Sequence, residues 1–135
     1  MPTLSQVAPR LPVRDLGRTI DFYSGRLGFG VNVLWPKTNP TFAILRRDST
    51  SVGFFEPTEH QTGRIGYAEL YIEVTDSLAL YDSIKSNVPI EWGPEFYSYG
   101  RREFSLRDPN GYLVIFTEPT EEPPSTSEPG DGSAG

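Results

Sequence analysis

The chain has 135 residues, with 18 acidic and 12 basic side chains and a formal charge of −6. This length fits one domain with its own core, and the absence of cysteine excludes a disulfide scaffold, a thiolate metal site and a thiol nucleophile. No apolar run approaches the length of a transmembrane helix, and Met1–Arg10 lacks the layout of a signal peptide. We therefore expect a cytoplasmic protein with no membrane partner. The acidic balance also argues against a nucleic-acid partner, because phosphate binding needs a basic surface.

The acidic charge is concentrated at the C-terminal end of the chain. Residues Glu118–Gly135 include five acidic residues and four prolines but no basic residue. A segment of this composition cannot bury enough apolar surface to offset its ordering entropy. We therefore expect residues 119–135 to form a disordered tail and residues 1–118 to form one nearly neutral domain.

The first part of the chain predicts a strand, a helix and three further strands. Gln6–Val13 is β-like, and Asp15 is a suitable N-cap for the segment that follows. Apolar residues at helical spacing predict a helix over residues 16–26 that ends at Gly28. Turn-rich segments then separate three strand-like runs, which are Val31–Trp35, Thr41–Arg46 and Ser51–Phe55.

A polar linker at Glu56–Gly66 precedes a second series of elements. Tyr67–Val74 is predicted to be a strand, and Asp76 is predicted to cap the helix that follows it. Asp108–Gly111 is a clear turn signal between two strands. The other strands of this series are predicted at Ile90–Trp92, Arg102–Arg107 and Tyr112–Thr117.

The two series are related by a shift of 61 positions. Asp15 aligns with Asp76, and the apolar residues around them align as well. Each series is a βαβββ unit whose single helix cannot cover both faces of its sheet, so two units should pack side by side. The sequence therefore predicts an α+β fold in which two βαβββ repeats, at about residues 6–56 and 66–118, form a curled mixed sheet around a cavity.

Three segments resemble the vicinal oxygen chelate superfamily, which includes glyoxalase I, extradiol dioxygenases, and fosfomycin and bleomycin resistance proteins. Leu11–Phe29 (LPVRDLGRTIDFYSGRLGF) looks like the opening signature of that superfamily, and Gly100–Phe116 (GRREFSLRDPNGYLVIF) looks like its final hairpin. With Tyr67–Asp76 between them, the resemblance spans roughly residues 6–118. It implies the same fold of paired βαβββ units.

The metal enzymes of this superfamily place His or Glu ligands on strands of both repeats. By the resemblance, these positions fall on Ala8, Gly53, Glu69 and Ile115. Only Glu69 can bind a metal, so the resemblance implies no metal, no cofactor and no enzymatic activity. A metal-dependent enzyme like a glyoxalase or a dioxygenase is the alternative, with Glu69, Glu103 and His60 as its donors.

The metal-free relatives that the chain most resembles are the bleomycin resistance proteins. Local matches to them lie at Pro57–Gln61, Ile72–Asp76 and Arg102–Pro109. Those relatives are homodimers that bind the antibiotic in grooves between subunits and sequester it unchanged. The resemblance thus implies a homodimer that binds a bleomycin-type antibiotic and confers resistance without turnover. Binding of a different metabolite is a further alternative.

A ligand with flat rings and a cationic tail needs stacking faces, carboxylates and polar edge contacts. Glu69, Tyr71 and Glu73 alternate along one strand, so they share a face, and the resemblance implies that this face lines the cavity. The alternative is an ordinary solvated face. The complete set of candidate ligand-binding residues is Trp35, Phe42, Phe55, Glu69, Tyr71, Glu73, Trp92, Tyr97, Tyr99 and Arg102.

Two groups of these residues carry structural expectations. The aromatic segment Glu95–Gly100 is expected to be an exposed loop, which favours Tyr97 and Tyr99 as stacking residues over the alternative that they pack on their own domain. Arg102 and Glu103 lie near the expected groove, and the alternative for them is a surface pairing with neighbours on adjacent strands, with small energetic consequence.

Overall fold

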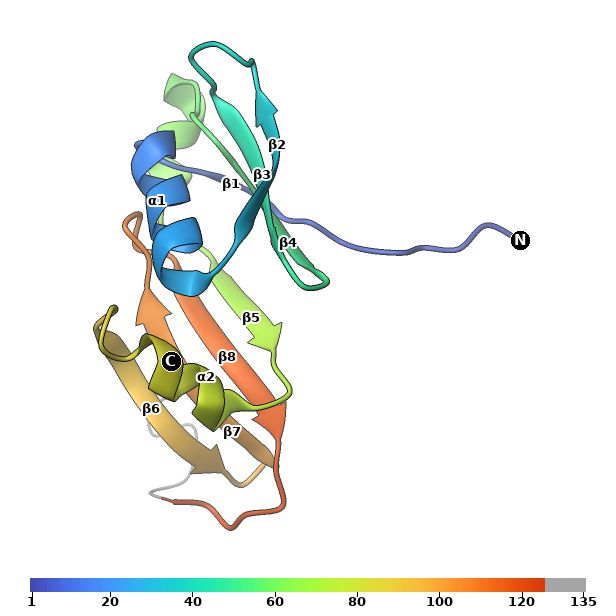
Figure 1. The fold of residues 1–135 in the computed structure, drawn as a ribbon, viewed down its shortest axis with the longest axis vertical. Coiled ribbons are helices and arrows are strands. Elements are labelled where there is room, and N and C mark those ends of the chain that lie inside the picture. Colours follow the sequence, from blue (N-terminus) through green and yellow to red (C-terminus); the bar gives the residue numbers. More distant parts are fainter. Residues whose placement is uncertain (126–135) are drawn as a thin grey trace. The chain divides into compact units, whose positions relative to one another are not determined.

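The chain folds into two compact units, residues 1–67 and the part that begins at Ala68 (Figure 1). The structure is a computed structural model that describes residues 1–125. The N-terminal unit contains β1 (Arg10–Pro12), α1 (Leu16–Leu27), β2 (Gly30–Trp35), β3 (Phe42–Arg47), β4 (Thr50–Phe55) and the 3₁₀ helix η1 (Glu59–Arg64). The C-terminal unit contains β5 (Glu69–Glu73), α2 (Ser77–Ile84), β6 (Ile90–Tyr97), β7 (Arg101–Arg107) and β8 (Leu113–Pro119).

Each unit forms an open four-stranded mixed sheet with the same topology. The strand order is β1-β4-β3-β2 in the N-terminal unit and β5-β8-β7-β6 in the C-terminal unit. In both sheets the first strand runs parallel to the fourth, and the other neighbours are antiparallel. The α+β fold with two βαβββ repeats is therefore confirmed.

Both helices begin where the sequence predicts. An Oδ1 atom of Asp15 accepts a hydrogen bond of 3.0 Å from the backbone N–H of Arg18, and Asp76 accepts one of 3.0 Å from that of Ala79. Each bond satisfies a backbone donor that the first turn of a helix leaves unpaired. The residue after α1, Gly28, adopts a left-handed conformation with φ of 76°, which ends the helix in the way glycine favours.

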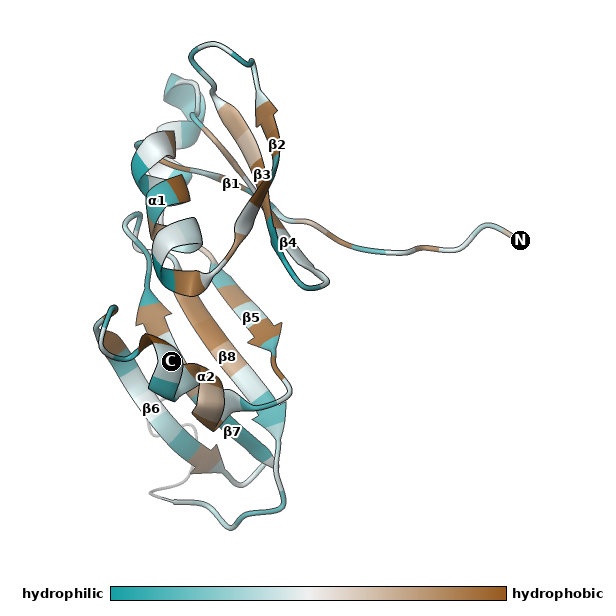
Figure 2. Cartoon of the chain, in the orientation of Figure 1, coloured by the Kyte–Doolittle hydropathy of each residue, from teal (hydrophilic) through white to brown (hydrophobic). Residues whose placement is uncertain are grey.

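Aromatic packing joins each helix to its own sheet. In the N-terminal unit, the ring of Tyr23 from α1 lies 4.8 Å from that of Phe54 in β4. In the C-terminal unit, Phe104 of β7 lies 5.4 Å from Tyr81 of α2 and 5.2 Å from Phe116 of β8. Figure 2 shows mostly hydrophobic residues along the upper part of β8 and polar residues on the outer side of α1. Burial of these apolar faces is the main force that holds helix and sheet together.

The structure corrects several predicted boundaries. The first strand covers only Arg10–Pro12, and the predicted linker contains η1. The strand predicted at Ile90–Trp92 continues to Tyr97, so the prediction that Glu95–Tyr97 belongs to an exposed loop is wrong. Two register shifts between Ile90 and Glu95 allow the pairing with β7 to continue past Gly93 and Pro94.

The last strand also extends beyond its predicted end. Glu118 is buried within β8, which continues to Pro119, one residue into the predicted tail. Further along, the backbone N–H of Ser125 donates to the carbonyl of Phe96 at 3.1 Å, and the Phe96 N–H donates to Ser125 Oγ at 2.9 Å. The chain after β8 therefore returns to β6. The predicted disorder of residues 126–135 lies outside the described residues.

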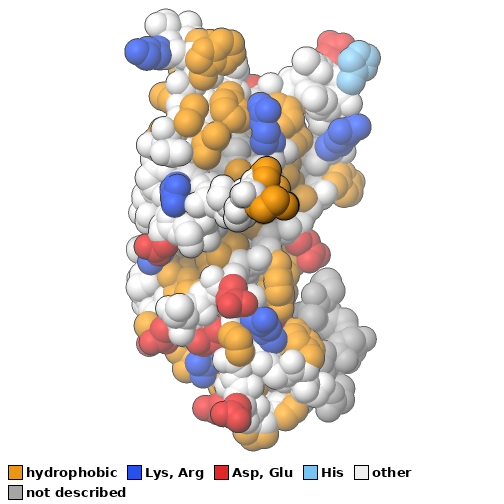
Figure 3. Space-filling model, turned by 90° about the vertical axis from the view of Figure 1, so that its right-hand side faces the viewer, with side chains coloured by type: hydrophobic (Ala, Val, Ile, Leu, Met, Phe, Trp, Pro, Cys, Tyr) orange, Lys and Arg blue, Asp and Glu red, His pale blue; other side chains and the backbone are white. Residues whose placement is uncertain are grey.

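Among residues 1–125, neither helix has the length and apolar composition needed to span a membrane. Figure 3 shows hydrophobic side chains interspersed with acidic and basic ones on the face that it draws.

Candidate ligand-binding site

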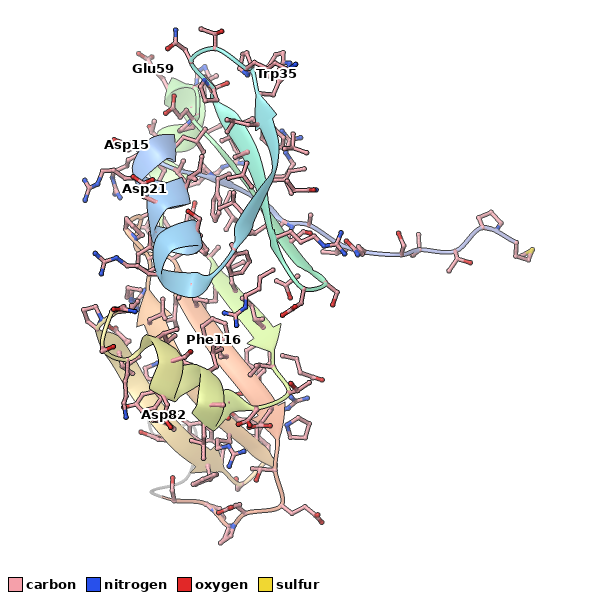
Figure 4. All side chains as sticks on the ribbon, in the orientation of Figure 1. Asp15, Asp21, Trp35, Glu59, Asp82 and Phe116 are labelled. Carbon is pink, nitrogen blue, oxygen red and sulfur yellow. The ribbon has the colours of Figure 1, made fainter. Side chains whose placement is uncertain are left out.

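In the N-terminal sheet, three of the predicted ligand residues form one aromatic row. Trp35 of β2 lies opposite Phe42 of β3, which in turn lies opposite Phe55 of β4. They share the sheet side away from α1, because the intervening residues Ala43 and Phe54 are buried against the helix side. The Trp35 side chain is 64% exposed at the end of β2 (Figure 4). This row offers an aromatic surface within the N-terminal unit.

In the C-terminal sheet, the alternation predicted for β5 is confirmed. Glu69, Tyr71 and Glu73 are exposed, whereas Leu70 is buried and Ile72 is half-buried between them. The three exposed residues lie on the side of the sheet away from α2, which we call the far face. A tyrosine and two carboxylates therefore share one side of this strand.

Strand register extends the far face across the whole C-terminal sheet. One cross-strand row runs from Tyr71 through Ile115 and Ser105 to Trp92. The adjacent row runs from Glu73 through Thr117 and Glu103 to Glu95. Paired residues project from the same side of a sheet, so polar and aromatic groups from all four strands meet here.

A buried carboxylate lies at the centre of the second row. Glu103 is only 2% exposed, and its carboxylate accepts hydrogen bonds from three hydroxyl groups. Tyr99 donates to Oε1 at 2.8 Å and Thr117 donates to Oε2 at 2.8 Å. Tyr71 also donates to Oε2. Within residues 1–125 no Lys or Arg side chain forms an ion pair with Glu103, so the hydroxyls supply the compensation that a buried carboxylate needs.

The two phenols of this cluster hold their protons strongly. Burial raises the pKa of Tyr99 far above its ordinary value, and the hydrogen bond to Glu103 raises it further. Burial and the same carboxylate also raise the pKa of Tyr71. Both side chains are still about half exposed, at 56% for Tyr71 and 52% for Tyr99. At neutral pH both are therefore protonated donors to Glu103 that a ligand can reach.

Tyr97 differs from the expectation that placed it on an exposed loop. Its side chain is 1% exposed, its ring stacks on Tyr99 with centroids 5.3 Å apart, and Trp92 meets it edge-on at 6.3 Å. Because β6 continues to Tyr97, the residue is held in the sheet rather than on a loop. The buried ring of Tyr97 therefore packs against one face of the half-exposed ring of Tyr99.

Arg102 points to the opposite side of β7, toward α2. Its Nη2 atom donates to Glu118 Oε1 at 2.6 Å, and its Nε atom donates to Ser77 Oγ at 2.9 Å. The alternative that it pairs with an adjacent strand is confirmed, because Glu118 lies directly opposite on β8. The pair is largely buried rather than at the surface, since the side chains are only 16% and 10% exposed. These hydrogen bonds hold the guanidinium on the helix side of the sheet, so Arg102 does not belong to the far face.

The four positions that the resemblance assigns to metal ligands do not form a ligand set in this chain. Ala8 precedes β1, Gly53 lies opposite Arg10, and Ile115 lies opposite Tyr71. Glu69 is the one donor among them, and His60 is exposed in η1. Among residues 1–125 no three His, Cys, Asp or Glu side chains gather so that they could hold a metal ion. The residues present therefore do not fit a catalytic divalent metal at these positions.

Sequence reasoning missed the central role of Glu103 and its neighbours Thr117 and Ser105. The signal is present in the alternation of polar Glu103 and Ser105 with apolar Phe104 and Leu106 along β7. This pattern places two polar groups on the far face and two apolar groups toward α2. It does not reveal that both polar residues are buried, because burial depends on partners from other strands.

Residues 3–116 match the family model described as the Glyoxalase/Bleomycin resistance protein/Dioxygenase superfamily. The chain belongs to this superfamily. Comparison with curated proteins gave no significant match.

Solved structures of this superfamily's fold include antibiotic-binding proteins. A bleomycin-binding protein from the bleomycin producer Streptomyces verticillus, complexed with copper(II)-bleomycin, is 28% identical, with a TM-score of 0.69 over 90% of this chain and 100% of that one. Another bleomycin-binding protein, complexed with bleomycin, is 26% identical, with a TM-score of 0.67 over 85% and 98%. The antibiotic-binding protein TnmS3 from Streptomyces sp. CB03234 shares the fold at 21% identity, with a TM-score of 0.72 over 89% and 100%.

Proposed function

We propose that this superfamily member binds a bleomycin-type antibiotic and sequesters it without chemical change, which confers resistance. The observation that carries the proposal is the far face of the C-terminal sheet. There the half-exposed rings of Tyr71 and Tyr99 lie beside the carboxylates of Glu69, Glu73 and Glu103. Rings of this kind stack on flat heteroaromatic groups, and the carboxylates attract a cationic tail.

The bleomycin-binding proteins support the nature of the ligand, since they share this fold at 26% and 28% identity. The donor set supports binding rather than metal-dependent turnover, because Glu69 stands alone among the positions that hold metal in related enzymes. We further propose that the protein acts as a cytoplasmic homodimer, as the resemblance to bleomycin resistance proteins implies. Sedimentation of the purified chain should then give twice the mass of one chain.

Titration with metal-free bleomycin tests the proposed function directly. The chain has two tryptophans, and both Trp35 and Trp92 belong to the candidate ligand-binding set, so their fluorescence should change and saturate at micromolar antibiotic. Trp35→Phe and Trp92→Phe, each measured alone, assign the signal to one residue or the other. Absence of a saturable change in the wild-type protein, checked by calorimetry, would refute the proposal.

Two further measurements separate sequestration from an enzymatic function. The mass of bleomycin recovered after incubation with excess protein should be unchanged, and cells that produce the protein should survive an otherwise lethal bleomycin dose. A modified antibiotic would show turnover, and stoichiometric zinc, nickel or iron in the purified protein would show that a metal is bound by residues outside the superfamily positions.

A further inference from the structure

The hydrogen bonds to Glu103 determine whether the hydroxyls of two half-exposed tyrosines can donate to a ligand or accept from it. A tyrosine hydroxyl has one proton to donate and lone pairs that accept. Tyr71 donates its proton to Glu103 Oε2, and Tyr99 donates its proton to Glu103 Oε1 at 2.8 Å. A carboxylate can only accept, so both phenols must donate to it. Toward a ligand, each phenol oxygen is then an acceptor.

The carboxylate also makes these oxygens better acceptors. A hydroxyl that donates to a charged group is polarised, and its own oxygen accepts a further hydrogen bond more strongly. Glu103 is only 2% exposed, so water screens its carboxylate little, and the two tyrosines that donate to it remain about half exposed. Exposed Glu69 and Glu73 on neighbouring far-face positions add negative potential of the same sign.

A second observation on the same face indicates a ligand with hydrogen-bonding groups. Ser105 alternates with Glu103 along β7, so its side chain leaves the strand on the far face. Ser105 is fully buried, and its hydroxyl has no hydrogen-bond partner among the described residues. A buried hydroxyl without a partner costs free energy. A polar group of a ligand that reaches past Trp92, which lies opposite Ser105, would satisfy it.

We propose that Tyr71 and Tyr99, with their protons held by Glu103, form an acceptor pair that binds the N–H groups of a cationic ligand such as an amidine, a guanidine or an ammonium. Glu103 is the positioning residue that sets this polarity, and Ser105 receives an adjoining polar group. The inference rests on the proposed function in placing the ligand on the far face. It goes further in that the hydroxyl pair supplies the hydrogen-bond acceptors for the ligand, in addition to the negative potential of Glu69 and Glu73.

Two small probes of similar shape and opposite charge test whether the site accepts hydrogen bonds from a ligand or donates to it. Benzamidine carries N–H donors on a flat ring, and benzoate carries acceptors on the same ring. Titration of the full-length protein, followed by nuclear magnetic resonance of its tyrosine rings, should show benzamidine bound about tenfold more tightly than benzoate. Equal affinity, or tighter binding of benzoate, would overturn the inference.

Substitutions then assign the preference to the proposed residues. In Glu103→Gln the new amide N–H₂ donates to one of the surrounding hydroxyls, which turns the proton of that hydroxyl outward. We expect affinity for benzamidine to fall about tenfold and affinity for benzoate to rise. The matched control is Asp82→Asn on α2, which removes one negative charge from the helix side of the sheet and should leave both affinities unchanged.

Tyr71→Phe combined with Tyr99→Phe keeps the rings and removes both acceptors, so it carries the test if Glu103→Gln does not fold. Benzamidine affinity should fall about tenfold in this double variant, and unchanged affinity would overturn the inference. Failure of the proposed function is distinguishable, because the wild-type protein would then prefer benzamidine to benzoate without binding bleomycin. A merely structural role for Glu103 would weaken both probes equally and would also overturn the inference.

Discussion

The carboxylate of Glu118, near the end of β8, accepts a hydrogen bond of 2.7 Å from the backbone N–H of Ser77, the first residue of α2. The N-terminal repeat has the same relationship in weaker form, because Glu56 Oε2 accepts from the N–H of Leu16, the first residue of α1, at 3.3 Å. A negative group at this end of a helix satisfies an unpaired donor and interacts favourably with the helix dipole. In the C-terminal repeat Glu118 also forms a buried ion pair with Arg102.

The first prediction concerns stability in acid. Burial by itself raises the pKa of Glu118, but hydrogen bonds from Ser77 and Arg102 outweigh it and hold the pKa below its ordinary value. The stability that this carboxylate contributes is therefore present above about pH 4.5 and is lost as the pH falls through the lowered pKa. Glu118→Gln should destabilise the protein by about 3 kcal/mol at neutral pH, because it leaves Arg102 without its counter-charge.

Urea denaturation at a series of pH values checks this prediction. The difference in unfolding free energy between wild type and Glu118→Gln should shrink as the pH falls below 4.5. Glu121→Gln removes the same charge from an exposed position and should change stability by less than about 0.5 kcal/mol. A constant difference at every pH would contradict the assignment.

The second prediction separates Tyr97 from its stacking partner Tyr99. Tyr97 is 1% exposed and packs against both Trp92 and Tyr99, so Tyr97→Ala should cost about 3–5 kcal/mol of unfolding free energy. Tyr99→Phe keeps its ring and loses one hydrogen bond to Glu103, with a cost of about 1 kcal/mol. Thermal unfolding followed by circular dichroism measures both. Similar small shifts in the two melting temperatures would be inconsistent with the packing.

The third prediction concerns Gly93, which lies in the part of β6 where the pairing with β7 shifts register. Gly93 has φ of 85°, and a Cβ atom added there would lie 2.4 Å from the carbonyl oxygen of Glu103. Gly93→Ala should therefore destabilise the protein by about 3 kcal/mol, through backbone strain together with a clash against β7. Gly25→Ala is the matched control. Gly25 lies in α1 with nothing within 4 Å of the added atom, so the change should stabilise by about 0.5–1 kcal/mol.

The fourth prediction concerns alkaline pH. Burial and Glu103 raise the pKa values of Tyr99 and Tyr71, so above about pH 10 the folded protein keeps protons that the unfolded chain has lost. The contribution of these two tyrosines to stability should be constant below that pH and should fall as the pH rises further. Unfolding of the Tyr71→Phe and Tyr99→Phe double variant should show a flatter alkaline limb. Tyr67→Phe, at an 85% exposed position, should leave the limb unchanged.

Local signals made the repeat units predictable from sequence. Asp15 and Asp76 act through donors three residues away, so the start of each helix follows from a short stretch of chain. The turn at Asp108–Gly111 is confirmed in the same way, because Asp108 Oδ1 accepts from the nearby N–H groups of Asn110 and Tyr112. Alternation along β5 correctly grouped Glu69, Tyr71 and Glu73 for the same reason.

The candidate site was harder to predict because its partners come from distant parts of the chain. Glu103 meets Tyr71, which is 32 residues away, and Arg102 meets Ser77, which is 25 residues away. Adjacent residues of β7 therefore enter two separate polar clusters on opposite sides of the sheet. Nothing in the local sequence distinguishes them from each other, which is why both were expected near the groove, with a surface pairing as the alternative.

The return of the chain to β6 after Pro119 also sets a practical limit on shortening this protein. The hydrogen bonds between Ser125 and Phe96 occupy backbone groups on the outer edge of β6, which would otherwise be free to pair with a strand of another molecule. A truncation chosen at the end of β8 would uncover these groups. Variants for crystallisation or fusion should therefore retain the chain through Ser125, so that this edge stays protected from association with other copies.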